Sequence, residues 1–280
     1  MSKTVEQFWQ RWGDTVRFLL WGLTAALVCF LLYRIVVNDT GTHLVPLSKA
    51  ERDSLMTVAV PRPSCMNDTL VRYDAFDVHF NSERGIANCA LYELVIDELN
   101  GTAERGNEFM ADPDVKGCPA PGDYAGSGFD RGHLVPAGDL KWSAKAMRQS
   151  FMLTNVAPMH KALNEGGWVK LEEKVREWTV RDSALLVFTG PVVSGSDTTL
   201  TSGLVTVPSA YYKVIMAPCV RPMRAIAFIY PNGRCNGRLS KYAVSVDEVE
   251  LKTGMDFFPT LPAEEQQRLE SGIHLDAWTN

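Results

Sequence analysis

The chain begins with a polar stretch that is followed by a long apolar run. Residues 18–37 form an apolar run broken only by Arg34, and residues 1–17 carry three basic side chains. A run of this length can cross a bilayer as a helix, with the late arginine reaching the headgroups. Basic residues ahead of a span favour a cytoplasmic N-terminus. We therefore predict a cytoplasmic segment at 1–17 and a transmembrane anchor at 18–37.

Two other interpretations of the apolar run are disfavoured. A cleaved signal peptide would have similar flanks, but no small-x-small cleavage site follows closely. A buried core helix fits poorly with a run at the extreme terminus. Residues 38–69 are mixed and polar and contain three prolines, so we predict a tether there and a single folded domain at 70–280.

Short apolar stretches separated by turn-forming residues begin near residue 70. Cys89 to Ile96 is rich in apolar residues, and Tyr73 to Phe80 precedes it across a polar turn at 81–85. Such runs are typical of strands. The predicted strands lie at residues 73–80, 89–96, 184–188, 204–207, 211–217 and 224–230, and a long loop is predicted at 100–122.

Helical spacing is clearest after Trp168. Apolar residues recur at Leu171, Val175 and Trp178, at intervals of three, four and three, which is the pattern of an amphipathic helix. Because helices and strands do not alternate regularly, we predict an α+β fold with a largely antiparallel central sheet. Shorter helices are predicted at 144–151 and 263–269, and loops at 156–158 and 164–167.

Composition allows one sizeable domain and shows a local excess of positive charge. The 280 residues are 46% hydrophobic and carry a net charge of −5, which does not indicate a nucleic-acid partner. Residues 131–181, however, hold nine basic residues against five acids, and this net +4 could attract phosphates to one face. An ordinary solvated helix surface is the alternative. The basic residues are Arg131, Lys141, Lys145, Arg148, Lys161, Lys170, Lys174, Arg176 and Arg181.

Cysteine usage gives a weaker signal. Cys29 lies in the apolar run, and the other five cysteines would face an oxidising space if the anchor is correct. Cys219 and Cys235 flank a predicted strand, and we predict a disulfide between them. No CxxC spacing is present, so a structural zinc site is not expected.

One stretch does not follow either periodicity. Residues 124–139 read Tyr-Ala-Gly-Ser-Gly-Phe-Asp-Arg-Gly-His-Leu-Val-Pro-Ala-Gly-Asp, with Asp130, Arg131 and His133 around Gly132. A neutral histidine can accept a proton from water near neutral pH, and an arginine can hold a phosphate with its planar fork. Taken alone, the stretch fits a polar turn with a structural histidine equally well.

A second group of polar residues follows at defined distances. It comprises Asn155 in Phe-Met-Leu-Thr-Asn-Val-Ala-Pro-Met, Asn164 in Leu-Asn-Glu-Gly-Gly-Trp, and Glu172 and Arg176 in Leu-Glu-Glu-Lys-Val-Arg. In order and spacing the combined pattern resembles the ββα-metal (His-Me finger) DNA/RNA non-specific endonucleases, a group that includes mitochondrial endonuclease G and bacterial sugar-non-specific nucleases. The resemblance covers roughly residues 70–262.

The resemblance implies a metal-dependent hydrolysis and a role for each central residue. Phosphodiester hydrolysis needs an activated water, charge stabilisation and help for the leaving oxygen. In this family one divalent ion, Mg²⁺ or alternatively Mn²⁺, supplies the last two. The resemblance places that ion on Asn164, makes His133 the general base and assigns phosphate binding to Arg131. Glu172 would accept hydrogen bonds from water on the ion.

The remaining polar residues would support the site. The resemblance gives Asn155 and Arg176 supporting positions, and Asp130 would orient the turn or the histidine. Simpler interpretations exist for several of these residues. Asn155 could be a turn residue, Asn164 could cap the following helix, and Glu172 could form a helix-surface ion pair with Arg176.

Two positions depart from the family pattern. Met159 stands where the family commonly has a glutamine, and Met110 stands where many members carry an arginine, although Arg105 lies nearby. These departures affect the grip on substrate more than the chemistry. They motivate a second hypothesis, a catalytically weakened member that binds nucleic acid or a partner. A phosphatase or phosphodiesterase for small substrates is a third.

The leading hypothesis is a membrane-anchored, metal-dependent endonuclease that hydrolyses phosphodiester bonds of DNA and RNA. Little sequence preference is expected, because contacts to the phosphate backbone carry no sequence information. The anchor at 18–37 would place the domain on the periplasmic or extracytoplasmic side of a bacterial-type inner membrane. The oligomeric state stays open, with a homodimer as one option, and so does the biological role.

Overall fold

The structure is a computed structural model that describes residues 43–59 and 68–279. Residues 44–280 form one compact unit, and of the other unit, residues 1–43, only His43 is described. The predicted anchor at 18–37 therefore lies outside the described residues. Among the helices that the structure describes, none combines the length and hydropathy needed to span a membrane.

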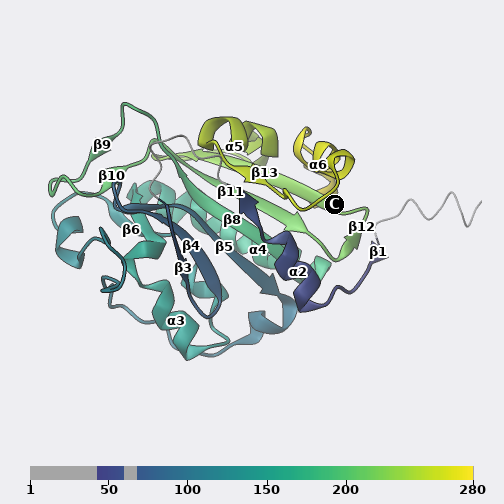
Figure 1. Ribbon diagram of the computed structural model, residues 1–280, viewed down its shortest axis with the longest axis horizontal. Helices are drawn as coiled ribbons and strands as arrows, with labels where there is room; N and C mark the ends of the chain where they lie inside the picture. Colours follow the sequence, from purple (N-terminus) through teal and green to yellow (C-terminus); the bar gives the residue numbers. More distant parts are fainter. Residues whose placement is uncertain (1–42, 60–67, 280) are drawn as a thin grey trace, which may run out of the picture. The chain divides into compact units, whose positions relative to one another are not determined.

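A seven-stranded sheet forms the centre of the unit (Figure 1). Its strand order is β14-β13-β11-β8-β5-β4-β3, and each neighbouring pair is antiparallel. The α+β prediction with a large antiparallel sheet is thus confirmed. The strands are β3 (Thr69–Arg72), β4 (Phe76–Asn81), β5 (Ile86–Val95), β8 (Ala184–Val192), β11 (Ala210–Ala217), β13 (Arg224–Pro231) and β14 (Ala243–Val244).

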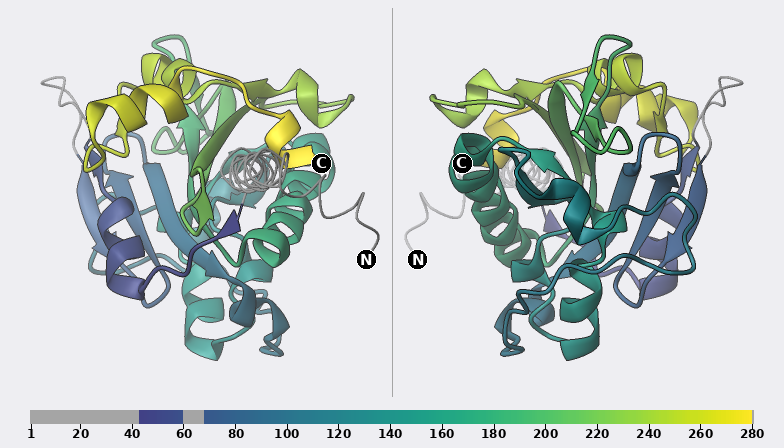
Figure 2. Two further views of the ribbon diagram at one scale, coloured as in Figure 1. Left: turned by 90° about the vertical axis from the view of Figure 1, so that its right-hand side faces the viewer. Right: turned by 90° about the vertical axis from the view of Figure 1, so that its left-hand side faces the viewer.

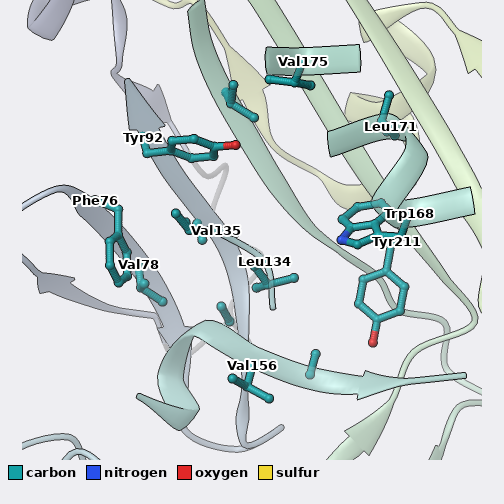
Figure 3. Packing of buried hydrophobic residues seen from close by; sticks show 14 of the residues in the cluster. Phe76, Val78, Tyr92, Leu134, Val135, Val156, Trp168, Leu171, Val175 and Tyr211 are labelled. Atoms are coloured by element: carbon teal, nitrogen blue, oxygen red, sulfur yellow. The ribbon is translucent and has the colours of Figure 1, made fainter. Parts of the chain in front are cut away.

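The two faces of the sheet bury separate sets of apolar side chains. Along β11, Tyr211 and Ile215 belong to one cluster, and Tyr212 and Val214 belong to the other, as expected for residues that alternate across a strand. Figure 3 shows part of the first cluster, with Trp168 lying beside Tyr211. The sheet therefore separates two cores, and different helices cover them (Figure 2).

The helices are divided between the two faces by their buried residues. Those packed in the first cluster are α3 (Ala144–Ser150), α4 (Val169–Asp182) and α7 (Asp276–Thr279). Those packed against the second are α2 (Lys49–Leu55), α5 (Val246–Thr253) and α6 (Ala263–Glu270). One-turn 3₁₀ helices lie at η1 (Ile96–Asn100), η2 (Pro121–Tyr124), η3 (Ala137–Asp139), η4 (Leu153–Asn155) and η6 (Leu239–Lys241).

Short strands complete the fold. The pair β6 (Asp130–His133) and β7 (Val156–Met159) forms a separate two-stranded antiparallel sheet. It is followed by a π-helical turn, η5 (Leu163–Trp168), which runs directly into α4. The other short strands are β1 (His43–Leu44), β2 (Val58–Ala59), β9 (Thr198–Thr199), β10 (Thr206–Val207), β12 (Val220–Arg221) and β15 (Asp256–Phe257).

Two segments predicted as loops are regular elements. Residues 156–158 belong to β7, which is only four residues long and contains Pro158, so the apolar pattern was too short to indicate a strand. Residues 164–167 belong to η5, whose two glycines suggested a loop. The burial of Leu163 and Trp168 holds this turn helical despite the low helix propensity of glycine.

Other predicted boundaries shift by a few residues. The helices predicted at 144–151 and 263–269 are present, as is the helix after Trp168. The first predicted strand, 73–80, begins only at Phe76, because Tyr73 closes a turn through its backbone hydrogen bond to the Phe76 carbonyl (2.9 Å).

The predicted disulfide is wrong. Cys219 and Cys235 are both free thiols, and Cys219 is buried. Cys219 precedes the first residue of β13 and Cys235 follows the last. The eight residues of this strand separate the two cysteines, whereas a disulfide needs Cα atoms within roughly 7 Å. The two cysteines lie at opposite ends of an extended strand, and this position keeps them too far apart to form a disulfide.

One long excursion interrupts the central sheet. Val95 at the end of β5 pairs with Ala184 at the start of β8, so the chain returns beside the point where it left. The excursion, residues 96–183, contains β6, β7, η5 and α4. Every candidate site residue from the sequence lies within it.

Candidate active site

The β6–β7 pair brings the two sequence motifs together. Its register sets Asp130 opposite Met159 and His133 opposite Val156. Gly132 is required by close packing, since a Cβ built there would lie 2.5 Å from the Met159 Cβ. The pair and the helical segment η5–α4 that follows form the ββα unit expected from the resemblance.

His133 is almost fully buried at the end of β6, with 8% of its surface exposed. Its ring contacts those of Phe109 (5.3 Å between centroids) and Phe151 (4.8 Å, edge-on), which also contact each other. Burial, together with the positive charge of Arg105, lowers the pKa of His133 to about 3. The imidazole is therefore neutral throughout the neutral pH range. Its Nε2 is buried and has no hydrogen-bond partner among the described residues.

Arg131 lies against two aromatic rings beside the histidine. Its guanidinium carbon is 5.3 Å from the centroid of Phe109 and 6.0 Å from that of Tyr124, and it donates a hydrogen bond to the Pro121 carbonyl (3.1 Å). These contacts fix the cation by stacking and leave most of its fork available. Nothing in the described part of the chain bonds its Nε.

Asn164 points toward β6 from the π-helical turn. Its side-chain nitrogen donates to the Asp130 carboxylate at 2.9 Å, so Asp130 orients the asparagine rather than the histidine. The amide oxygen keeps its lone pairs, because no donor among the described residues is bonded to it. Asn164 does not cap a helix, since it lies inside η5 and α4 has no side-chain cap.

One open pocket collects these groups. It has a volume of about 470 Å³ and is lined by both polar and aromatic side chains. Asn155, Glu172 and Arg176 do not line it. The lining includes Arg105, Phe109, Tyr124, Asp130, Arg131, His133 and Asn164.

Asn155 has a structural position outside the pocket lining. It is fully buried, its side-chain oxygen accepts from the Val135 backbone N–H, and its nitrogen donates to the carbonyls of Val135 and Ser150, each at 3.0 Å. These three bonds join the end of β6 to the end of α3. Asn155 therefore holds the histidine strand in place without contacting the pocket.

Glu172 and Arg176 share one face of α4 but do not pair with each other. Arg176 donates to Asp139 (2.7 Å), which also accepts from the Tyr92 hydroxyl (2.8 Å). Burial raises the pKa of Glu172 to about 7, and the positive charge of Lys213 opposes that rise. The simpler interpretation, a helix-surface ion pair between Glu172 and Arg176, is therefore not what the structure shows. Both residues belong instead to a partly buried network of charges.

Lys213 is the member of this network that the sequence did not reveal. It is fully buried on β11, and its ammonium has no hydrogen-bond partner in the described part of the chain. The nitrogen lies 4.7 Å from the centre of the Trp168 ring, whose Nε1 donates to the His133 carbonyl at 3.3 Å. The sequence did contain a signal for this residue, because Lys213 is the one charged residue in the apolar strand predicted at 211–217.

The locally basic stretch is less positive in three dimensions than in sequence. Five of its nine cations form ion pairs, and two of the partners, Asp74 and Asp182, lie outside the stretch. The expected attraction for phosphate therefore concentrates at the pocket arginines. The paired cations are Lys145, Lys161, Lys174, Arg176 and Arg181.

The two methionines that depart from the family pattern lie outside the pocket lining. Met159 is fully buried against Gly132, and Met110 forms backbone hydrogen bonds with Phe151 and Leu153. Arg105, by contrast, lines the pocket with its guanidinium carbon 5.6 Å from the Phe151 ring centre. A second arginine thus faces the same space as Arg131.

The pocket fits a hard divalent cation with few protein ligands. Asn164 offers a neutral amide oxygen that Asp130 holds in a fixed orientation. The pocket is open enough for water molecules beside that oxygen. Mg²⁺ commonly keeps several waters and uses only one or two protein ligands.

Comparison with known proteins shows similarity across most of the chain. Residues 56–264 match the sequence profile of the family described as DNA/RNA non-specific endonuclease. The chain is 35% identical over 217 residues to Nuclease C1 of Cunninghamella echinulata var. echinulata, covering 71% of this chain and 86% of the relative. It is 30% identical over 269 residues to a nuclease of Nostoc sp., covering 89% and 96%.

Similarity to mitochondrial proteins is more partial. The mouse mitochondrial nuclease EXOG is 32% identical over 209 residues, which cover 68% of this chain but only 57% of the relative. Among solved structures, the complex of EndoG with EndoGI contains a chain with a TM-score of 0.66 and 22% identity. The match covers 71% of this chain and 89% of that one, and at this identity it supports the fold alone.

Proposed function

Because this chain belongs to the DNA/RNA non-specific endonuclease family, we propose that it is a divalent-metal-dependent endonuclease that hydrolyses phosphodiester bonds of DNA and RNA. The observation that carries the proposal is the single pocket lined by Arg131, His133 and Asn164. Its charged groups suit phosphates rather than base edges, which agrees with little sequence preference.

His133 is the general base of the proposed reaction. Its neutral ring takes a proton from a water molecule in the pocket as the water attacks phosphorus. A pKa of about 3 makes the free imidazole a weak base. A bound phosphate would raise that pKa, because its negative charge stabilises the imidazolium and offsets Arg105.

Arg131 and Arg105 are the proposed phosphate-binding groups. Arg131 is held over Phe109 and Tyr124, so its fork is already oriented before substrate arrives. Arg105 supplies a second positive charge at the same pocket. This position supports Arg105 as the replacement for the arginine that the family often carries at the position of Met110.

Asn164 would hold the divalent ion through its amide oxygen, with Asp130 fixing the side chain. When bound, such an ion supplies positive charge that stabilises the transferred phosphate and the leaving oxygen. We assign Glu172 a supporting role as a hydrogen-bond acceptor for water, which requires its ionised form. Mg²⁺ is the proposed ion, with Mn²⁺ as a substitute.

Cleavage of supercoiled plasmid and of RNA tests the proposal. Cleavage is expected with Mg²⁺ and should stop with EDTA. His133→Ala should lower the rate by ~10²–10⁴-fold, the usual contribution of a general base, and leave the Mg²⁺ dependence intact. Asn164→Ala should instead shift the Mg²⁺ dependence to higher concentration. Metal-independent cleavage, or near-wild-type cleavage by His133→Ala, would sink the mechanism.

The anchor at 18–37 and an extracytoplasmic location are part of the same proposal. They are supported by the apolar run and by the basic residues ahead of it. A catalytically weakened binding protein is less favoured, because neither Met110 nor Met159 lines the pocket. Tight plasmid binding without nicking, at any Mg²⁺ concentration, would favour that alternative.

A further inference from the structure

A group of three acidic side chains lies away from the pocket, on α5 and α6. Asp247 and Glu250 are three residues apart on α5 and therefore share one face. Glu270 is the last residue of α6. One carboxylate oxygen from each of the three lies within 4.8 Å of the other two. The cluster thus joins two helices that are separated along the chain.

Glu270 gives this cluster a feature that ordinary surface acids lack. Only 7% of its surface is exposed, and its Oε1 is buried with no hydrogen-bond partner among the described residues. Its position at a helix C-terminus is also unfavourable for negative charge, because the unpaired helix carbonyls point there. A buried carboxylate oxygen aimed into an acidic cluster lacks the partner that such groups normally have.

No basic side chain supplies the missing partner. Within residues 43–59 and 68–279, no lysine or arginine lies within ion-pair distance of Asp247, Glu250 or Glu270. Asp256 on β15 adds a further negative charge near the same place. Burial, followed by repulsion from these neighbours, raises the pKa of Glu270 to about 8 and that of Glu250 to about 7.

We propose that Asp247, Glu250 and Glu270 bind one divalent cation of the calcium type, which ties α5 to α6. All three ligands are hard carboxylate oxygens, which such cations prefer. Glu250 accepts a hydrogen bond from the Phe257 N–H through Oε1 (2.7 Å) and keeps its other oxygen for the ion. Asp247 is exposed, so the ion can enter from solvent and retain water.

Calcium fits this cluster better than magnesium does. Calcium accepts six to eight oxygens in irregular geometry and binds carboxylates through one or both oxygens. Magnesium requires a nearly ideal octahedron and gives up its waters reluctantly. Three carboxylates from two helices, one of them almost fully buried, suit the more tolerant ion.

The cation would be structural rather than catalytic. Val246 and Val249 of α5 and Leu269 of α6 pack in the second apolar cluster, whereas the first cluster contains Leu134 and Leu163, the chain neighbours of His133 and Asn164. Helix α4, which also packs in the first cluster, lies on the other side of the sheet from α5 and α6 (Figures 1 and 2). The family profile ends at residue 264, before Glu270. The site is therefore independent of the proposed nuclease chemistry.

Thermal unfolding of the full chain tests the site without an activity measurement. Asn164→Ala is used as the background, so that binding at the nuclease pocket does not contribute. Calcium at about a hundred times its Kd should raise the Tm by ~5–10 °C over the same protein in EDTA, and calorimetric titration should give one site. Absence of a shift at millimolar calcium would overturn the proposal.

Two substitutions and a matched control locate the effect. Glu270→Gln and Asp247→Asn should each abolish the calcium-dependent shift. Asp247 is exposed, so its change should leave the fold intact. Glu248→Gln, on the same helix but paired with Lys252, should keep the shift. In EDTA, Glu270→Gln should be as stable as its parent or more so. An undiminished shift in Glu270→Gln, or a shift with Mg²⁺ but not Ca²⁺, would contradict the assignment.

Discussion

At the scale of single residues, Lys213 is the least expected part of the site. It is a buried ammonium without a hydrogen-bond partner in the described residues, and its pKa is lowered by burial and raised again by Glu172 and Asp139. Arg176 and Cys89 complete the titratable groups around it. A charge in this position favours the ionised form of Glu172.

Replacing Lys213 should therefore change the pH dependence of cleavage. In Lys213→Met the pKa of Glu172 rises further, so the fall in activity on the acid side should move upward by about one pH unit. Activity near pH 7 should drop about fivefold, because the ionised fraction of Glu172 falls, and it should recover at higher pH. The measurement is plasmid cleavage from pH 6 to 9, with the exposed Lys170→Met as control. An equal loss at every pH would mean that Lys213 only packs.

His133 should make the folded protein sensitive to acid. Its folded pKa of about 3 lies below its ordinary value, so the unfolded chain takes up a proton first as the pH falls. As the pH falls below the ordinary pKa of histidine, the free energy of unfolding therefore decreases, by about 2 kcal/mol at about pH 5. Urea unfolding should show a smaller acid loss for His133→Ala than for wild type. The exposed His160→Ala should retain the full loss.

The sequence predicted which polar residues would gather in one pocket but not all of their contacts. Arg131, His133 and Asn164 were predicted from motif spacing, and they do line one pocket. Asp130 was predicted to orient the turn or the histidine, but it accepts a hydrogen bond from Asn164. This contact depends on how η5 folds back over β6. Lys213 is far from the motif in sequence, and only the sheet brings it under α4.

At the scale of elements, the β6–β7 pair carries the site through one close approach. A Cβ on Gly132 would lie 2.5 Å from the Met159 Cβ, and real Cβ atoms do not come so close. Gly132→Ala should therefore force the two strands apart and cost about 1–3 kcal/mol of unfolding free energy.

The matched control for that prediction is Gly166→Ala. Gly166 lies in η5, and a Cβ there would meet nothing within 4 Å. Its replacement should leave stability unchanged or slightly raised, since alanine restricts the unfolded chain. Chemical denaturation of both variants compares them directly. Equal stability of Gly132→Ala and wild type would mean that β6 and β7 can move apart at little cost.

The sequence predicted helices and strands correctly where an apolar pattern repeats over many residues. It failed for short elements whose conformation depends on the burial of a few side chains. The repeat from Trp168 to Trp178 gave α4 directly, and the apolar runs gave the central strands. The four-residue β7 and the glycine-containing η5 are too short to have a period. They are regular because Trp168 and Met159 are buried in the first apolar cluster, and the local sequence does not show that burial.

At the scale of the whole molecule, the first 37 residues should be dispensable for cleavage. All the pocket residues lie in the excursion at 96–183 and the sheet lies within 69–244. Deleting residues 1–37 should give a soluble protein that folds by circular dichroism and cuts plasmid at the rate of the full chain. A truncated protein that folds but does not cut would show that the N-terminal segment has a further role.

The two ends of the excursion lie side by side in the central sheet, and this affects how the protein could be engineered. Because Val95 and Ala184 are paired neighbours, residues 96–183 could be exchanged with those of a relative by joining only two adjacent points. Such a graft would carry the complete pocket while the host kept its own sheet and C-terminal helices. Lys213 lies outside the pocket lining on β11, against the ring of Trp168, and would come from the host, so a compatible host must already have a lysine there.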